Sequence, residues 1–526
     1  MNDFFYCSTN AYIVLRFQRY MLGFFIIFLP ITLFPIQFPI VGNSIPLIFL
    51  MLGYFGYLME IIIYPKSITK YEKYGSLFLG ILLGWNILSG IVDINYYQYF
   101  QFLDINQDDK LRILYTNLNF GFTVNDLIVT KIWISFLSIR GAIFNCLFGY
   151  GIVLWIIHMY KDDFDEAFKD INRAIHVLCV IISIYSIFEV GYLLGIYFCK
   201  DILTYINPLF MKVAYLNDWW PPLLWTNLQV RSLFAEPSFF GMFLAMALPF
   251  LSSDFFEGDI TKRKKALASI LYIFMIMLLV MSKARTALVL FLCEMITLFG
   301  WQLIFNKKDW NKFSQLIGCT FLAICLGLFC IFHFQSIDNK VVQLNNTSVQ
   351  SYVSQNVTSV VGNQRSNSAR KANVIAMINV GLQNPIFGVG QELVHEYMAD
   401  KLTIEDLNNP EVRKWTDDLK GKGPLRAGYP ILNQLAWSFA TQGIIGLMLF
   451  GFPILYILYK YFLYRKYLSD FKEVFSLIAF EGLVIAFFSN SAQLEYFVLC
   501  GLLFCLLRVC QEFCVNRFNK QHRIAA

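Results

Sequence analysis

Long apolar stretches separated by short polar segments run along the whole chain. A helix needs about 20 apolar residues to cross roughly 30 Å of hydrocarbon. Twelve stretches approach this length and predict spanning helices over residues 20–41, 44–64, 75–92, 141–160, 174–198, 233–251, 267–281, 286–305, 316–334, 437–461, 474–488 and 494–513. Three prolines interrupt the first stretch, and the stretches ending at residues 281 and 488 are short, so the limits of these three are the hardest to set from the pattern.

Composition identifies the solvent of these helices as lipid. Of the 526 residues, 57% are hydrophobic and 15% charged, a balance that a soluble domain of this size could not carry on its surface. The twelve cysteines show no CxxC spacing, so neither a zinc site nor a disulfide framework is indicated, and we expect no metal and no cofactor. The sequence therefore predicts an all-α polytopic membrane protein with about 12 transmembrane helices.

The distribution of Lys and Arg predicts how the chain is oriented, because short cytoplasmic segments are enriched in these residues. With twelve spans, one side of the membrane receives the basic segments 16–19, 66–73, 161–173, 262–265, 307–312, 465–472 and 517–523. That side is expected to be the cytoplasm. We then divide the chain into helices 1–9 over residues 1–334, a large outer loop over 335–436, and helices 10–12 with a cytoplasmic tail over 437–526. No cleavable signal peptide is expected, because the first apolar run is too long and lacks a small-residue cleavage pattern.

The large outer loop has helical organisation of its own. Residues 368–382, SARKANVIAMINVGL, can form an amphipathic helix with Asn367 or Ser368 as its N-cap. Asn384-Pro385 should end this helix, and the glycines of residues 388–390 should form a tight turn.

Several charged residues collect on the outer side in this topology, namely Arg231, Glu236, Lys283, Arg285, Arg365 and Arg370. Charges beside apolar surface usually face a partner or a water-filled cavity. They could instead only anchor helix ends at the interface, but the bias of basic residues toward the cytoplasm disfavours that explanation for the arginines. Planar guanidinium forks suit pyrophosphate. We therefore expect Arg231, Arg285, Arg365 and Arg370 to bind pyrophosphate, with Arg365 in the loop ahead of the helix that carries Arg370.

Five sequence elements between residues 231 and 450 resemble those of O-antigen and exopolysaccharide polymerases of the Wzy type. RSLFAEPSFFG at 231–241 is similar to their R-x-x-F-x-E-P-S-x-x-G segment, and SKART at 282–286 resembles their S-R element. The spacing from Arg370 to Gly381 fits R-x10-G, and NPIFGVG at 384–390 fits N-P-x-x-G-x-G. NQLAWSFATQGIIGLMLF at 433–450 resembles the segment that opens the next span. Related O-antigen ligases usually have His just before the Asn of this last element, where the chain has Leu432.

The resemblance implies a glycosyltransferase of the GT-C type in the bacterial inner membrane, with its active site facing the periplasm. Donor and acceptor would be undecaprenyl-pyrophosphate-linked oligosaccharides within the membrane lipid, with a chain-length regulator protein as a further candidate partner and no nucleic acid. The alternative function is that of an O-antigen ligase, which transfers the glycan to lipid A core. A lipid-linked glycan transporter or flippase is disfavoured, because the largest hydrophilic segment does not divide the chain into two halves.

A general base must take the proton of the acceptor hydroxyl. We expect Glu236 to be this catalytic residue and His395, which follows the Gly-Val-Gly turn, to be the second choice. Pro237 disfavours helical geometry at Glu236, so the carboxylate can lie at a helix start near the outer surface. The alternative is that Glu236 only pairs with Arg231 or another arginine and shapes the site.

Overall fold

The structure is a computed structural model of the chain. It describes residues 2–64, 68–96, 109–118, 126–161, 163–213, 221–225, 228–258, 261–304, 309–333, 365–465 and 470–525. The described residues form helices and no strands. In chain order the helices are α1 (Asn2–Ile27), α2 (Ile45–Ile63), α3 (Lys70–Tyr96), α4 (Asp109–Leu118), α5 (Asp126–Phe148), α6 (Tyr150–Tyr160), α7 (Phe164–Leu193), α8 (Tyr197–Phe210), α9 (Pro237–Ser253), α10 (Lys262–Ser282), α11 (Arg285–Ile304), α12 (Trp310–Phe332), α14 (Arg365–Gln383), α15 (Val394–Ala399), α16 (Ile404–Leu407), α17 (Pro410–Lys422), α18 (Gln434–Tyr464), α19 (Phe471–Ala486) and α20 (Leu494–Ala525).

Within the described ranges, nine helical segments are long and apolar enough to cross a membrane. They comprise α2, α3, the joined α5 and α6, α7, α10, α11, α12, α18 and the first part of α20. The chain is thus an all-α polytopic membrane protein. The other three expected spans fall on α1, α9 and α19, and the last two have only 17 and 16 residues. Twelve crossings therefore stay a prediction.

The second half of the first expected span is not helical, so the expected limit at residue 41 is wrong. Helix α1 ends at Ile27, and the chain then turns back on itself through an isolated bridge between Phe38 and Gly42. The reason is the prolines at positions 30, 35 and 39, which lack a backbone N–H and clash with the preceding helical turn.

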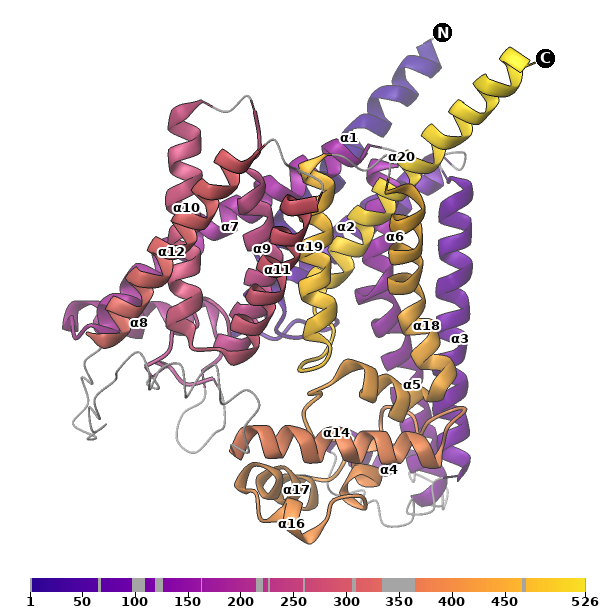
Figure 1. Cartoon of the computed structure of the whole chain (residues 1–526). Helices are drawn as coiled ribbons and strands as arrows, with labels where there is room; N and C mark the ends of the chain where they lie inside the picture. The colour runs from indigo at the N-terminus through magenta and orange to yellow at the C-terminus, as the bar shows by residue number, and fades with distance from the viewer. Residues whose placement is uncertain are drawn as a thin grey trace.

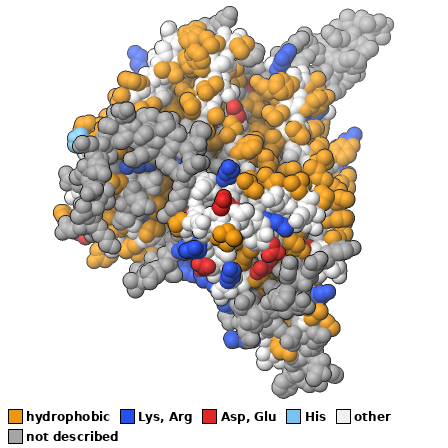
Figure 2. Space-filling model, turned by 60° about the horizontal axis from the view of Figure 1, so that its bottom comes forward, with side chains coloured by type: hydrophobic (Ala, Val, Ile, Leu, Met, Phe, Trp, Pro, Cys, Tyr) orange, Lys and Arg blue, Asp and Glu red, His pale blue; other side chains and the backbone are white. Residues whose placement is uncertain are grey.

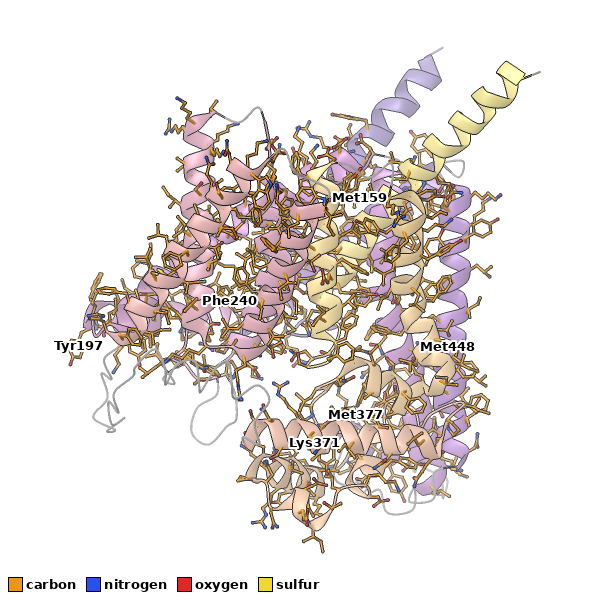
Figure 3. The ribbon with its side chains drawn as sticks, viewed as in Figure 1. Met159, Tyr197, Phe240, Lys371, Met377 and Met448 are labelled. Carbon is orange, nitrogen blue, oxygen red and sulfur yellow. The ribbon has the colours of Figure 1, made fainter. Side chains whose placement is uncertain are left out.

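The two ends of the helical bundle differ (Figure 1). Both termini and the start of α10 lie at one end, and α14 to α17 cover the other. Lys371 and Met377 on α14 lie beneath the bundle, whereas Met159 lies at the opposite end (Figure 3). Hydrophobic side chains cover much of the bundle's sides, and charged ones gather on the end that carries α14 to α17 (Figure 2). The start of α10 thus shares one end of the bundle with both termini, and which end faces the cytoplasm stays a prediction.

The described part of the large loop has a hydrophobic core of its own. Met377 and Val380 on α14 pack with Val394, Met398 and Leu419 from α15 and α17. The helix predicted over 368–382 is present but begins earlier, at Arg365, and ends at Gln383, directly before the Asn384-Pro385 pair. One apolar side of α14 thus faces this core, whereas Ile375, Ile378 and Leu382 on the same helix are exposed.

A break in helix α18 receives the segment 384–390. Gly443 interrupts the helix with φ 66° and ψ −167°. The amide N–H of Ile444 donates to the carbonyl of Pro385 at 2.8 Å, and that of Val389 donates to the carbonyl of Ala440 at 2.9 Å. A Cβ atom on Gly443 would lie 2.1 Å from the carbonyl oxygen of Ile386. Backbone groups freed by the break are therefore satisfied by the inserted segment, which fastens the end of α14 to the membrane helices.

Candidate functional site

A cavity of about 710 Å³ lies where the starts of α9, α11, α14 and α17 meet the loop between α19 and α20. Its charged lining residues are Glu236, Lys283, Arg285, Arg370 and Glu411. Three of the residues expected from the sequence, Glu236, Arg285 and Arg370, are thus brought together from segments far apart in the chain.

Glu236 is the residue before helix α9, which begins at Pro237. Its backbone is extended, with φ −137° and ψ 155°, as the following proline predicts. The hydroxyl of Ser238 donates a hydrogen bond to one carboxylate oxygen. The carboxylate lines the cavity at the start of a helix, where the helix dipole favours negative charge.

Arg285 is the first residue of α11 and reaches across to the first turn of α14. Its Nη2 donates to the hydroxyl of Ser366 at 2.7 Å, and its Nη1 lies 3.3 Å from the side-chain oxygen of Asn367. Lys283, two residues before it, adopts a left-handed conformation that turns the chain from α10 into α11. The turn therefore brings two cations to the cavity.

Arg370 projects from α14 toward the membrane helices. Its Nη1 donates to the carbonyl of Ser489 at 2.7 Å. Burial lowers the pKa of Arg370, the charge of Glu236 opposes this shift, and the positive charge of Arg285 adds to it. A guanidinium stays protonated in proteins. The two arginines therefore repel each other beside the cavity while Glu236 attracts Arg370.

The expected loop position of Arg365 is wrong. Arg365 is the first residue of α14, and Asn367 lies inside the helix, where its side chain accepts from Arg285 instead of capping. Arg365 and Arg370 are five positions apart, about 140° around an ideal helix. The Arg365 side chain lies outside the described part of the structure, so pyrophosphate binding by this residue stays a prediction.

Arg231 is buried, with 1% of its surface exposed, and does not line the cavity. Its guanidinium lies 5.9 Å from the ring centre of Trp225, which does line it. Its guanidinium donates to the carbonyls of Pro222 at 3.1 Å and Ala235 at 3.3 Å. Its backbone N–H donates to the carboxylate of Glu189 at 3.1 Å. Within the described residues no ion pair joins Arg231 to Glu236, and the arginine whose charge acts on Glu236 is Arg370. The alternative that Glu236 only pairs with an arginine and shapes the site thus stays open. Arg231 holds the segment before α9 in place.

His395 does not line the cavity either. It lies on α15 in the core of the large loop, where its Nδ1 accepts a hydrogen bond of 3.2 Å from the backbone N–H of Tyr429. Its ring centre lies 5.6 Å from that of Trp437. Burial lowers the pKa of His395 to about 4. The neutral ring thus serves packing, and its position gives no support to the expected role as second choice of base.

Two residues that line the cavity, Glu411 and Ser489, were not predicted from the sequence. Glu411 is in the first turn of α17 behind Asn409, whose side chain caps the helix and also donates to Ser368 of α14 at 2.7 Å. The Asn-Pro-Glu sequence signals a helix start, but nothing in it signals proximity to Glu236. Ser489 contributes its backbone carbonyl, which accepts the hydrogen bond from Arg370. Every residue has such a carbonyl, so the residue type at this position does not predict the contact.

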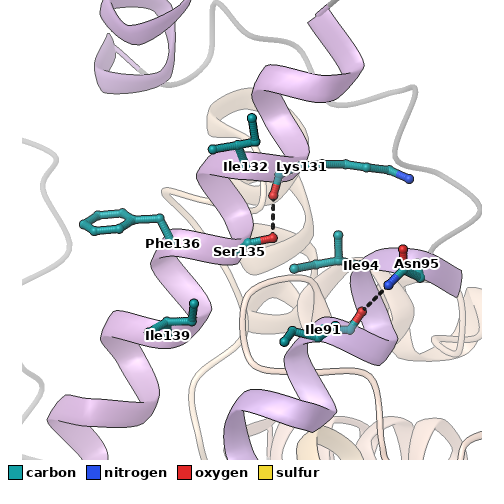
Figure 4. Close-up of a pocket in the computed structure, with 8 residues that line it drawn as sticks. All are labelled: Ile91, Ile94, Asn95, Lys131, Ile132, Ser135, Phe136 and Ile139. Atoms are coloured by element: carbon teal, nitrogen blue, oxygen red, sulfur yellow. Dashed lines mark hydrogen bonds between the residues drawn. The ribbon is translucent and has the colours of Figure 1, made fainter.

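A second cavity, between α3 and α5, is mostly apolar and has a volume of about 450 Å³. Two of its polar side chains bond within their own helices, Ser135 to the carbonyl of Lys131 and Asn95 to that of Ile91 (Figure 4). Ligand sites combine an apolar lining with a few convergent polar groups. The cavity beside Glu236 has such groups, which makes it the candidate site. In the described ranges no three His, Cys, Asp or Glu side chains are placed to hold a metal ion.

Comparison with known proteins identifies the region that carries most of this site. Residues 270–451 match the family model described as O-antigen ligase. The matched region includes Lys283, Arg285, Arg370 and Glu411 and ends within α18, beyond the break at Gly443. Neither the curated proteins nor the solved structures give a match.

Proposed function

From the chain's membership in the O-antigen ligase/polymerase superfamily, we propose that it is a polysaccharide polymerase of the bacterial inner membrane. It joins oligosaccharide repeat units carried on undecaprenyl pyrophosphate, at the periplasmic end of the bundle. The observation that carries this proposal is the convergence of Arg285, Arg370 and Lys283 with the carboxylate of Glu236 on one cavity. The resemblance to Wzy-type polymerases supports the choice of polymerase.

The cations suit the leaving group of such a transfer. An acceptor hydroxyl attacks the anomeric carbon of the donor glycan, and the bond from that carbon to the pyrophosphate oxygen breaks. Negative charge develops on the departing pyrophosphate, and fixed cations beside it stabilise the transition state. A bound pyrophosphate also relieves the repulsion between Arg285 and Arg370. Attack from the face opposite the leaving group inverts the anomeric centre.

Glu236 takes the proton from the acceptor hydroxyl in this proposal. It is the expected carboxylate that lines the cavity, whereas His395 does not line it. Glu411 is the other carboxylate there, and it is the competing candidate. Glu236→Gln keeps the side-chain volume but cannot act as a base. We expect it to bind lipid-linked substrate and to lose polymerisation by about a hundredfold or more.

The matched variants are Glu411→Gln in the same cavity and His395→Ala in the loop core. If Glu236→Gln polymerises at near wild-type rate and Glu411→Gln is inactive, the general base is Glu411 rather than Glu236. Loss of activity in His395→Ala with normal thermal stability would return the role to His395.

The overall activity is tested with purified protein in detergent and lipid-linked repeat units. A ladder of lengthened glycans on the lipid supports the polymerase. Transfer of glycan to lipid A core without a ladder would make the protein a ligase, the second candidate because the matching family model is described as O-antigen ligase. Exchange of substrate across vesicles without new glycosidic bonds would refute glycosyl transfer. A chain-length regulator as partner is tested by whether its addition changes the ladder.

A further inference from the structure

An apolar stripe on α14 points away from the hydrophobic core of the large loop. Ile375, Ile378 and Leu382 are spaced by three and four residues, so they lie on one side of the helix. Each is at least 40% exposed, and so is Ile386, which follows the helix. None of these four residues lines the cavity beside Glu236. Neither the core of the loop nor the candidate site therefore accounts for this apolar surface.

The segment that follows the stripe lies at the depth of the membrane helices. The hydroxyl of Ser89 on the spanning helix α3 donates a hydrogen bond of 2.5 Å to the carbonyl of Phe387. The ring of Trp85, one turn away on α3, stacks on the ring of Phe387 with their centres 5.2 Å apart. Helix α3 ends at Tyr96, so roughly 10 Å of helix extends beyond Ser89 and roughly 16 Å beyond Trp85. Phe387 therefore lies beside the interior of a spanning helix and not beyond its end.

Exposed apolar side chains continue from this segment onto the outer side of α18. The carbonyl of Pro385 accepts a hydrogen bond of 2.8 Å from the backbone N–H of Ile444, so Ile386 lies against the break in α18. Beyond the break, Ile444 and Met448 are one helical turn apart, and both are exposed on a helix that spans the membrane. Met448 lies closer to the middle of the bundle than α14 does (Figure 3). The lipid that covers Met448 therefore extends to Ile386 at the end of the stripe.

The direction of α14 and a cation beside the stripe fit a helix that lies in the plane of the membrane surface. Helix α14 runs across the end of the bundle, not along the spanning helices (Figure 1). Lys371 precedes Ile375 by four residues, on the same side of α14, and is exposed. Interfacial helices combine an apolar side with Lys or Arg, because the apolar side chains enter the acyl chains while the cations stay at the lipid phosphates.

We propose that α14 is an interfacial helix whose stripe is covered by the glycerophospholipids of the leaflet at its end of the bundle. Ile375, Ile378 and Leu382 lie among the acyl chains, with this side of the helix buried about 5–10 Å into the boundary between headgroups and hydrocarbon. Lys371 lies at the lipid phosphates. In the expected topology this is the periplasmic leaflet.

The interfacial position sets the height of Arg370 relative to the membrane. Arg370 directly precedes Lys371, so its turn of α14 lies at the level of the lipid phosphates, and its Nη1 donates to the carbonyl of Ser489 at 2.7 Å. A pyrophosphate attached to a membrane lipid lies at this level too. Helix α14 thus carries Arg370 to the height of its ligand. This consequence rests on the proposed function, whereas the burial of the stripe in lipid does not.

The test measures depth in the full-length protein, in nanodiscs of equal parts phosphatidylethanolamine and phosphatidylglycerol, with one nitroxide-labelled cysteine in a cysteine-depleted background. Labels on Ile378→Cys and Leu382→Cys should collide more with oxygen, which dissolves in acyl chains, than with a water-soluble nickel chelate. The ratio of the two accessibilities should be several-fold higher than at Arg413→Cys, an exposed position on α17. It should approach the ratio at Met448→Cys on α18, and Lys371→Cys should give an intermediate value.

Two stripe positions keep the test decisive if one label disturbs the fold, which gel filtration monitors. The proposal is refuted if the labels at both positions give the same ratio as the label at position 413, because the stripe then lies in water. It is also refuted if both reagents are excluded, because protein then covers the stripe. Lipid-buried labels in a protein that lengthens no glycan would refute the proposed function and leave the interfacial helix in place.

Discussion

Nη2 of Arg285 donates a hydrogen bond of 2.7 Å to the hydroxyl of Ser366, across 81 residues of sequence. Arg285 begins a membrane helix, and Ser366 lies in the first turn of the helix that covers the end of the bundle. Together with the bond from Arg370 to the carbonyl of Ser489, this contact positions α14 over the cavity. The same two guanidinium groups are among those expected to bind pyrophosphate, so we expect docking of the loop and binding of the substrate to depend on the same side chains.

Replacing Arg285 or Arg370 by Ala should abolish long polymer while single repeat units accumulate. Removing one donor to a developing anionic charge costs on the order of a hundredfold to a thousandfold in rate. Lys should restore activity only in part, because an ammonium lacks the planar fork. Ser366→Ala, which removes the docking contact and keeps Arg285, should retain most activity. Glycan length on gels gives the measurement, and normal lengths in stably expressed Ala variants would refute pyrophosphate binding by these arginines.

Arg231→Ala should lower stability rather than act at the site. It leaves the buried carbonyl of Ala235 and the partly buried carbonyl of Pro222 without this donor, and a buried unsatisfied group costs about 1–3 kcal/mol. We expect a lower melting temperature in detergent and less protein in the membrane. The exposed Arg413→Ala should melt like the wild type. An inactive Arg231→Ala that melts normally would show that Arg231 belongs to the site after all.

Acidification should destabilise the fold of the large loop, because His395 must be protonated as the pH falls. Its pKa is about 4 in the folded protein and near 6.5 when unfolded, so between these values the unfolded state binds more protons. Stability therefore rises with pH across this window, and acidification from pH 7 to pH 4 costs about 3 kcal/mol. Hydrogen exchange of α14 to α17 should increase as the pH falls toward 4.5, after correction for the intrinsic rate. His395→Gln should show a flatter dependence, and equal slopes would contradict this role.

Gly443→Ala should displace the segment 384–390 from the break in α18. Alanine at φ 66° is strained, and its Cβ would clash with the carbonyl of Ile386. We expect faster proteolysis of the loop and a clear loss of polymerisation. Gly451→Ala lies on the same helix in open surroundings and should behave like the wild type. Unchanged proteolysis of Gly443→Ala would mean that the junction is not rigid.

The orientation is tested by cysteine labelling in a cysteine-depleted background. Arg413 on α17 and Lys264 in the first turn of α10 are both exposed. Helix α17 and the start of α10 lie at opposite ends of the bundle. A membrane-impermeant reagent added on the periplasmic side should label a cysteine at position 413. It should label a cysteine at position 264 only after the membrane is permeabilised. The reverse pattern would place the cavity beside Glu236 in the cytoplasm and refute the proposed function.

The apolar pattern predicted a span at each of the nine segments that are long and apolar enough to cross a membrane. The reason is that a helix in lipid must satisfy its backbone internally and show apolar side chains along its whole length. It misplaced the first span, where the composition stays apolar but prolines end the helix at Ile27. The start of α14 was also misplaced. Its first turn is bonded by Arg285 from another helix, a partner that local sequence does not reveal.

The sequence by itself determined that the chain lies in a membrane, that α14 ends before Asn384-Pro385, and that Pro237 holds Glu236 out of its helix, because each of these follows from local backbone chemistry and hydrophobicity. Only the tertiary structure decided which charges share a cavity. Four arginines expected on one side were equivalent in sequence, but folding buries Arg231 among carbonyls and brings Arg285 and Arg370 beside Glu236. A charge acquires its role from the groups that surround it, and those groups come from helices that are distant in the chain.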